Sequence, residues 1–204
     1  MIILQNDDGG CADQLKVTRS WHAEYAKYHG YEYVVMCEKA PVGMSPHWGK
    51  VVALKKLLRS LDKNSVFWII DCDAVIKKAR KEDKLDGVLL PEKEFALVKS
   101  LPILNAKFNS GVMPIRVTDM MIDFFDQVLK LGQIPNNKTP GEQARIIDLL
   151  LKTPKLNFQE LDSKYNNYMG SKYVKTPVIR AFHGEGDRSK IPNLLTLAMN
   201  IEDF

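Results

Sequence analysis

Two aspartates separated by one residue, in Asp71-Cys72-Asp73, have the spacing of a cation-binding pair. They directly follow Val66 to Ile70, the longest uninterrupted apolar run in the chain. In an extended strand end, side chains two positions apart point the same way, so both carboxylates are expected to face one hard divalent cation. Open α/β sheets bind ligands outside the carboxyl ends of their strands. The pair therefore predicts a divalent-cation site, and a solvated strand-end turn is the alternative.

His183 is the best candidate for a third ligand, because it follows the predicted strand Val178 to Phe182. A neutral imidazole beside two carboxylates favours Mn²⁺ over Mg²⁺, which is the alternative ion. An ion held in this way typically neutralises a nucleotide diphosphate and stabilises it as it leaves. The other histidines are expected to be hydrogen-bonded structural residues: His22, His29 and His47.

Alternating strands and helices are expected to position these side chains. Apolar runs bounded by turn residues predict strands, and apolar positions with a helical period predict helices. This alternation is typical of a parallel-type α/β sheet. The expected strands cover residues 1–5, 31–36, 66–70, 95–99, 111–116, 156–161 and 178–182. The first expected helix begins at Asp13, as N-cap, and ends at Gly30, and the second covers about 48–60. The third begins at Thr118, as N-cap, and ends at about 131, and the fourth covers 140 to about 151, opened by the capping box Thr139-Pro140-Gly141-Glu142.

Length, charge and cysteine content restrict the function further. The 204 residues are enough for one globular domain with a full core. A net charge of +4, spread along the chain, is weak support for a nucleic-acid partner and suits a modest anionic ligand better. No apolar run approaches the roughly 20 residues of a membrane helix. Three cysteines without a C-x-x-C spacing favour a reducing compartment, so a cytoplasmic protein is expected.

Several short blocks together resemble the galactosyl, xylosyl and mannosyl transferases of the GMA12/MNN10 type. They occur in the order seen in that family and span roughly residues 20–190. The blocks are Tyr25-Ala26-Lys27-Tyr28-His29-Gly30-Tyr31, Trp48-Gly49-Lys50, Phe67-Trp68-Ile69-Ile70-Asp71-Cys72-Asp73-Ala74, Asn109-Ser110-Gly111-Val112 with Ile115-Arg116, Glu142-Gln143-Ala144 and His183-Gly184-Glu185-Gly186.

The resemblance implies a GT-A fold, which is a single Rossmann-like α/β domain over residues 1–204 with a mostly parallel central sheet flanked by helices. The nucleotide-binding part is expected over about 1–75 and the acceptor-side part over about 95–190. The family implies a nucleotide-sugar donor, with UDP-hexose ahead of GDP-mannose, and a glycan or glycoprotein acceptor. We expect the chain to lack the membrane anchor and stem of eukaryotic members. It looks more like a soluble bacterial or virus-encoded member, such as the capsid-glycosylating enzymes of large algal viruses, which would act in the host cytoplasm, and an excised catalytic domain of a longer protein is the alternative.

The resemblance also implies transfer with retention at the anomeric carbon. A retaining enzyme needs no dedicated general base, because the departing diphosphate oxygen can take the acceptor proton. An inverting enzyme would need one, and the candidates are then Asp119, Asp162 and Glu185.

Metal and donor contacts follow from the same blocks. The resemblance implies that Asp71 and Asp73 hold metal and donor and that His183 completes the coordination. Lys50 is expected near the donor diphosphate, and a solvated position on a lysine-rich helix is its alternative. The sugar side is expected to be lined by Asn109, Ser110 and Gly111, for which a simple strand-entry turn is the alternative.

Two residues are expected beside the reacting carbon, Glu142 and Gln143. Most relatives carry Asp at the position of Glu142, and its carboxylate can instead cap the helix, so Gln143 is the better candidate for contact with the sugar. The diphosphate is expected to be covered by Arg188 and Lys190, on a polar, glycine-containing segment over 184–192 that is expected to be mobile, and ordinary surface charge is the alternative for both residues. One acid of the turn after the first strand, Asp7 or Asp8, is expected to bind the ribose or the base.

Two other functions fit part of this pattern. A phosphatase of the haloacid-dehalogenase type also has D-x-D after an apolar strand, but that strand stands near the beginning and a second acidic pair follows a later strand. A nucleotide-sugar-binding module that keeps the fold without turnover is the other alternative, and it predicts binding without cleavage.

Overall fold

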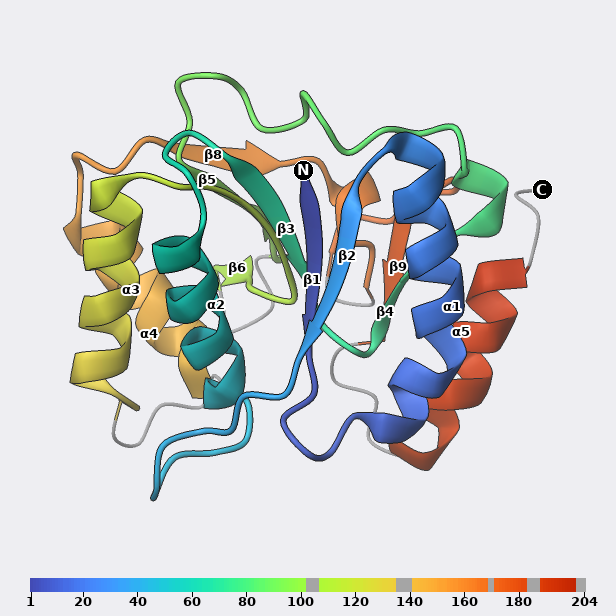
Figure 1. The fold of residues 1–204 in the computed structure, drawn as a ribbon, viewed down its shortest axis with the longest axis horizontal. Helices are drawn as coiled ribbons and strands as arrows, with labels where there is room; N and C mark the ends of the chain where they lie inside the picture. Colours follow the sequence, from blue (N-terminus) through green and yellow to red (C-terminus); the bar gives the residue numbers. More distant parts are fainter. Residues whose placement is uncertain (102–106, 135–140, 169–170, 183–187, 201–204) are drawn as a thin grey trace.

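The computed structural model describes residues 1–101, 107–134, 141–168, 171–182 and 188–200, which form a central sheet with helices on both faces (Figure 1). The elements in chain order are β1 Ile2–Asn6, α1 Ala12–His29, β2 Glu32–Met36, α2 Trp48–Ser60, β3 Val66–Ile70, β4 Ala74–Ile76, η1 Lys78–Arg80, β5 Phe95–Lys99, β6 Phe108–Asn109, β7 Val112–Arg116, α3 Asp119–Leu131, α4 Gly141–Lys152, β8 Phe158–Leu161, η2 Ser163–Tyr165, β9 Ile179–Ala181, η3 Arg188–Lys190 and α5 Ile191–Asn200.

The central sheet has the strand order β2-β1-β3-β7-β5-β6, with β8 paired to β5. The α/β fold with flanking helices is confirmed, but the sheet is mixed rather than mostly parallel. β1 runs parallel to β2 and β3, and β5 to β8, whereas β7 is antiparallel to β3 and β5, and β6 to β5. Residues 100–107 and 110–111 connect β5, β6 and β7, fewer than the dozen or so that a parallel crossover needs.

Each face of the sheet is covered by its own core. Figure 1 shows α2, α3 and α4 on one face and α1 and α5 on the other. Successive strand side chains point to opposite faces, so Phe67 and Ile69 of β3 pack with the first group and Trp68 and Ile70 with the second. This two-sided burial explains why β3 is apolar throughout.

Helix ends agree with the sequence where local signals are strong. α2 and α3 match their predicted ranges, and the Thr118 side chain accepts a hydrogen bond from the Met121 amide as the N-cap. α1 instead has Cys11 as N-cap, without a side-chain cap bond, and Asp13 lies in the first turn, where its charge complements the helix dipole. α4 is described from Gly141 onward, so the predicted capping residue Thr139 lies outside the described residues.

Besides the short 3-10 helices η1, η2 and η3, the strands β4 and β6 and the helix α5 are absent from the sequence prediction. β4 pairs antiparallel with β9, and α5 packs against α1 and β4. The segment over 184–192 that is expected to be mobile is helical from residue 188, and residues 184–187 lie outside the described part. Proline is tolerated in a first helical turn, so Pro192 does not prevent α5. Within the described residues, no helix is both long and apolar enough to span a membrane.

Candidate active site

The two aspartates stand in a tight turn after β3. The Ala74 amide donates to the Asp71 carbonyl at 3.0 Å, so the predicted extended strand end is wrong. Asp is favoured at the first position of such turns, and the chain must change direction here to begin β4. Cys72 is buried in this turn, whereas Asp71 and Asp73 on either side of it are half-buried. The turn therefore leaves the two aspartates more exposed as residues than the cysteine between them, although Asp73 Oδ1 is buried.

Neighbouring strands hold this turn in place. The Gln5 amide Nε2 donates to the Asp71 carbonyl at 3.3 Å, and the Asp71 amide donates to the Gly111 carbonyl at 2.7 Å. The Cys72 thiol donates to the Asn6 carbonyl at 3.2 Å. The D-x-D turn is thus bonded to the end of β1 on one side and to the start of β7 on the other.

Lys50 of α2 joins three of the predicted blocks. Its Nζ lies 3.0 Å from Asp71 Oδ1 and 2.7 Å from Glu142 Oε1, and it donates to the Ser110 carbonyl at 3.1 Å. Only 7% of Lys50 is exposed. Burial alone lowers the pKa of Lys50, but the carboxylates of Asp71 and Glu142 outweigh it and raise the pKa above its usual value. A charged ammonium with three donors is thus engaged by three acceptor groups.

The close approach of α2 depends on Gly49. A Cβ at this position would lie 2.3 Å from the Glu38 carbonyl oxygen and 3.1 Å from Asn6 Nδ2. Asn6 in turn makes two hydrogen bonds of 2.9 Å with the backbone of Glu38. Glycine therefore lets the start of α2, and with it Lys50, lie against the end of β1.

Ser110 connects the block Glu142-Gln143 to its own block Asn109-Ser110-Gly111, which we call the N-S-G block. Gln143 Oε1 accepts from the Ser110 amide at 3.0 Å, and Glu142 Oε1 accepts from the Ser110 hydroxyl at 3.2 Å. These bonds fix the orientation of the Gln143 amide group. On the other side, Asn109 Oδ1 accepts from the Gly111 amide at 2.7 Å and from Asn166 Nδ2 at 2.8 Å.

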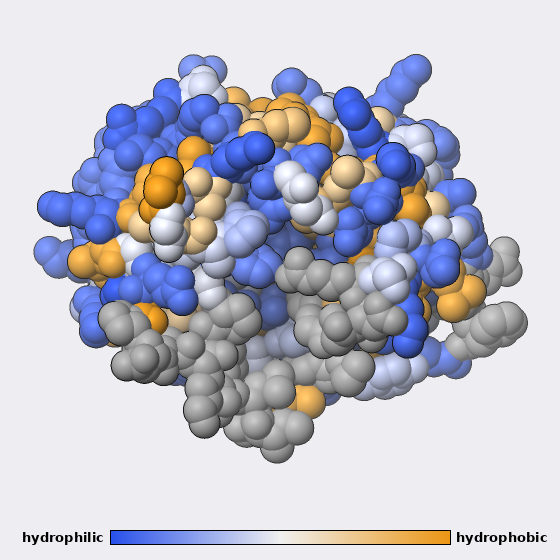
Figure 2. Space-filling view, turned by 90° about the horizontal axis from the view of Figure 1, so that it is seen from below, coloured by the Kyte–Doolittle hydropathy of each residue, from blue (hydrophilic) through white to orange (hydrophobic). Residues whose placement is uncertain are grey.

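The turn after β1 lies at the same edge of the sheet. Asp7 Oδ1 accepts from the Gly9 amide at 2.9 Å and Asp8 Oδ1 from the Gly10 amide at 2.8 Å. Both aspartates are half-buried. In the view from below in Figure 2, hydrophilic residues are prominent among the coloured atoms at this end of the molecule.

The third predicted metal ligand, His183, lies outside the described residues. The preceding residue, Phe182, donates its amide to the Asp73 carbonyl at 2.9 Å. The described chain therefore leads from β9 directly to the D-x-D turn. Within the part of the chain that the structure describes, no group of three or more His, Cys, Asp or Glu side chains is arranged to hold a metal ion.

Arg188 and Lys190 belong to η3, which packs with α5. Lys190 is exposed, and the Arg188 side chain lies outside the description. The described hydrogen bonds and ion pairs join Lys50, Asp71 and Glu142 to Ser110 and, through Ser110, to Gln143.

Sequence reasoning missed the buried polar groups beneath the site. Gln5 Oε1 accepts from the Tyr33 hydroxyl at 2.6 Å and lies 3.0 Å from His22 Nδ1. His22 is completely buried, its Nε2 accepts from the Ile76 amide, and burial lowers its pKa to about 3. The structural role expected for His22 is confirmed. A lone Gln in an apolar strand was the available signal for this network, and the pair Asn166-Asn167 was the signal for the other side.

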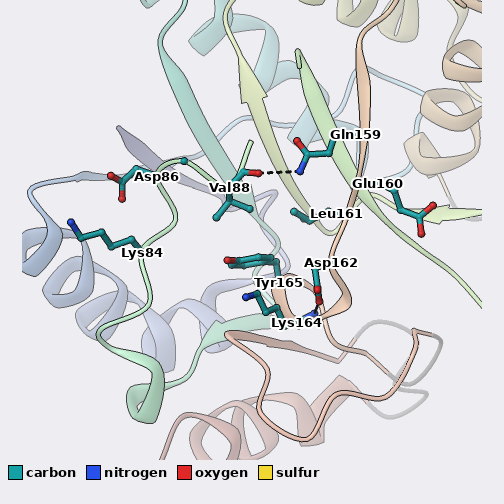
Figure 3. Close-up of a pocket in the computed structure, with 10 residues that line it drawn as sticks. Lys84, Asp86, Val88, Gln159, Glu160, Leu161, Asp162, Lys164 and Tyr165 are labelled. Atoms are coloured by element: carbon teal, nitrogen blue, oxygen red, sulfur yellow. Dashed lines mark hydrogen bonds between the residues drawn. The ribbon is translucent and has the colours of Figure 1, made fainter. Parts of the chain in front are cut away.

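A pocket of about 500 Å³ lies elsewhere, between the loop over 84–88 and β8 with η2 (Figure 3). Its polar lining includes Lys84, Asp86, Asp162 and Tyr165. In the described bonds, none of these four contacts the Lys50 cluster, by which we mean Lys50 with Asp71, Ser110 and Glu142. We therefore place the candidate active site at the Lys50 cluster and the D-x-D turn.

The sequence profile of the galactosyl transferase GMA12/MNN10 family matches residues 1–113, more than half of the chain. The chain belongs to this family. The match includes the D-x-D turn, Lys50 and the N-S-G residues, whereas Gln143 and His183 lie beyond it. A search of the curated proteins found no significant match to the GMA12/MNN10 family member described here.

Solved structures share the fold of this GMA12/MNN10 family member. A glycosyltransferase involved in the glycosylation of the major capsid of PBCV-1 has 15% identity and a TM-score of 0.76, over 96% of this chain and 98% of that one. The galactosyltransferase LgtC, in complex with donor and acceptor sugar analogues, has 12% identity and a TM-score of 0.60, over 98% and 97%. Mouse xyloside xylosyltransferase 1 has 12% identity and a TM-score of 0.55, over 90% and 97%.

At these identities the structural likeness shows the GT-A fold. Family and fold together identify a glycosyltransferase, a class that takes a nucleotide-sugar donor and an acceptor. The family match gives no support to the haloacid-dehalogenase alternative.

Proposed function

We propose that this chain is a metal-dependent, retaining hexosyltransferase that moves a sugar from a UDP-hexose to a glycan or glycoprotein acceptor. The observation that carries the proposal is the buried Lys50 ammonium, which binds Asp71 of the D-x-D turn, the Ser110 carbonyl and Glu142 within one cluster. Burying charged groups costs free energy, so a buried cluster of paired charges is seldom kept for stability alone. Its place beside the half-buried Asp71 and Asp73 favours a functional site.

The residues at the turn suit a hard divalent cation. Asp71 and Asp73 supply carboxylate oxygens, and the backbone bond between Phe182 and Asp73 supports a site that includes His183. We propose that these three side chains hold Mn²⁺, with Mg²⁺ as a weaker substitute. When bound, the ion would offset the charge of the departing diphosphate.

Lys50 is better suited to positioning than to direct contact with the donor. Its ammonium is already engaged by Asp71, Glu142 and the Ser110 carbonyl, so it fixes the two carboxylates relative to one another. Glu142 acts through Lys50 for the same reason. Gln143 is the proposed contact to the sugar at the reacting carbon, because Ser110 fixes its amide group.

The other contacts are proposed from position. Asn109, Ser110 and Gly111 line the sugar side. Asp7 or Asp8 binds the ribose or base, since their turn borders the D-x-D turn. Arg188 and Lys190 offset charge on the diphosphate. We propose that the nucleotide-binding part covers about 1–75 and the acceptor-side part about 95–190.

Retention agrees with the position of Glu142. This side chain is buried and paired with Lys50, which gives it poor access to an acceptor hydroxyl. The leaving diphosphate oxygen can instead take the acceptor proton on the same face of the sugar. No dedicated general base is then needed.

The test is donor cleavage. Purified protein is incubated with Mn²⁺ and a panel of UDP- and GDP-sugars, and free nucleotide is measured, with the anomeric product read by NMR. We expect UDP-hexose cleavage that is lost in Asp73→Ala and kept in Asp13→Ala, whose carboxylate is exposed on α1. Saturable binding of the donor without product would indicate the non-catalytic module instead.

A further inference from the structure

Two of the three cysteines lie at the candidate site. Cys72 stands between the two aspartates, and Cys11 is the N-cap of α1. The Cys72 thiol lies 3.2 Å from the Asn6 carbonyl oxygen, and the Cys11 thiol lies 3.7 Å from Asp8 Oδ1. The two thiols therefore contact residues 6 and 8, where β1 ends and the following turn begins.

The strand register explains why these thiols meet. β1 and β3 are parallel neighbours with Leu4 opposite Ile69, so the segments that follow them leave the sheet side by side (Figure 1). The Cys11 side chain, followed by burial, raises the pKa of the Cys72 thiol, as expected for two neighbouring thiols. Cys72 is buried and Cys11 is partly exposed, so a reagent in solution reaches Cys11 first.

The third cysteine provides an internal comparison. Cys37 follows β2, which pairs with the opposite side of β1 from β3, and it is exposed. Oxidation governed by exposure alone would modify Cys37 first. Oxidation governed by proximity would instead join the buried Cys72 to its neighbour.

We propose that Cys11 and Cys72 form a reversible disulfide, by exchange with a small-molecule disulfide such as glutathione disulfide, and that this bond suppresses donor use. In an otherwise reducing compartment, such bonds are typically transient and redox-sensing. The effect on donor use rests on the proposed function, whereas the crosslink does not.

The exchange is balanced in two steps. The Cys11 sulfur bonds to one sulfur of the small disulfide, the S–S bond of the reagent breaks, and one small thiol leaves with the Cys11 proton. The Cys72 sulfur then bonds to the Cys11 sulfur, the mixed disulfide breaks, and a second small thiol leaves with the Cys72 proton. The protein loses two hydrogen atoms, and the reagent is reduced to two thiols.

Bond formation must displace the turns that carry the acids. A disulfide bond is about 2.05 Å long, well below the contact distance of two unbonded sulfur atoms. The D-x-D turn and the turn after β1 are therefore drawn together. A misplacement on the order of 1 Å costs an enzyme roughly a hundredfold in rate, so we expect donor cleavage to fall at least about tenfold.

The crosslink is tested on the reduced full chain and on Cys37→Ser. Each is incubated with excess glutathione disulfide and digested without reduction for peptide mass spectrometry. We expect a linked Cys11–Cys72 peptide pair in both, reversed by dithiothreitol. Glutathione adducts on Cys11 without the crosslink, or a Cys11–Cys37 link in the wild type, would overturn the proposal.

The effect on donor use is tested on Cys37→Ser before oxidation, after it and after reduction. The matched control is Cys11→Ser in the Cys37→Ser background, which keeps Cys72 but has no partner for it. We expect inhibition and recovery only where Cys11 is present. A crosslinked protein that cleaves donor at the reduced rate would refute the suppression. Reduced protein that cleaves no donor would count against the proposed function instead, because the crosslink is read by mass.

Discussion

Lys50 Nζ lies 2.7 Å from Glu142 Oε1, and the two side chains are only 9% and 6% exposed. They belong to α2 and α4, and they meet because these helices pack on the same face of the sheet. Removing one partner of a buried ion pair leaves the other charge without compensation, which costs far more than the net value of the pair.

Lys50→Met is therefore expected to lower the free energy of unfolding by about 2–4 kcal/mol, somewhat below the range for fully buried pairs because Asp71 is 29% exposed. Lys55→Met is the matched control, since Lys55 pairs with Asp126 at the surface of α2 and should cost about 1 kcal/mol or less. Urea denaturation measures both. Adding Glu142→Gln to Lys50→Met should recover part of the loss, and a double variant as unstable as the sum of the two single ones would argue against the pairing.

Gly49→Ala tests whether α2 must approach β1 closely. The added Cβ would lie 2.3 Å from the Glu38 carbonyl oxygen, which is backbone and cannot rotate away. We expect a loss of about 1–3 kcal/mol in the free energy of unfolding, from overpacking. Gly10→Ala is the comparison, because its Cβ would meet only the Asp8 side chain at 3.3 Å. Equal stability of both variants would show that α2 is free to shift.

The sequence could predict elements whose signals are local. The range of α3 followed from Thr118 and an apolar stripe, and the range of β3 from an apolar run. The D-x-D turn could not be predicted in its true geometry. It depends on β4, whose partner β9 lies more than a hundred residues later in the chain.

The site residues were predictable by type but not by partner. Lys50 was expected near a diphosphate, yet its acceptors come from the turn after β3, from the segment before β7 and from α4, and only the packing of α2 brings these together. Gln5 and Asn166 were missed because a buried polar side chain looks like a surface residue in the sequence. Its role becomes visible only once its partners are known.

Gln143→Ala tests the residue proposed to contact the sugar. Loss of one positioned hydrogen-bonding group at a reacting centre typically lowers kcat by about a hundredfold or more. We expect this drop in a protein that remains folded, with the free energy of unfolding lowered by about 1 kcal/mol because the buried Ser110 amide loses its acceptor. Gln159→Ala removes an amide that bonds only Val88 and Leu90 in the described contacts, and its kcat should match the wild type. A rise in KM with normal kcat would assign Gln143 to donor binding rather than to the transferred group.

Metal removal tests the proposed ligands Asp71, Asp73 and His183. Chelation by EDTA should abolish donor cleavage, and Mn²⁺ should restore it better than Mg²⁺ because an imidazole joins the carboxylates. In His183→Ala the Mn²⁺ concentration for half-maximal activity should rise about tenfold or more, as ligand-sphere changes do. His29→Ala, at the end of α1, is the control histidine. Full activity in EDTA would exclude metal dependence, and an unchanged Mn²⁺ requirement in His183→Ala would remove that residue from the site.

His22 makes the stability of the fold depend on pH. Burial lowers its pKa from 6.5 to about 3, so between these values the unfolded chain binds a proton that the folded chain does not. The free energy of unfolding should therefore decrease as the pH falls below about 6.5, by up to about 1.4 kcal/mol per pH unit. Urea denaturation at several values between about pH 7.5 and 5 measures this slope, above the range in which most carboxylates titrate.

His22→Gln separates the histidine from other titrating groups. Glutamine keeps an amide near Gln5 and the Ile76 amide but binds no proton in this range. The variant should be less stable than the wild type at about pH 7.5, because a fully buried ring is replaced by a side chain of different shape. Its stability should nevertheless change less between about pH 6.5 and 5. Parallel pH profiles of the two proteins would show that protonation of His22 does not control the acid sensitivity of the fold.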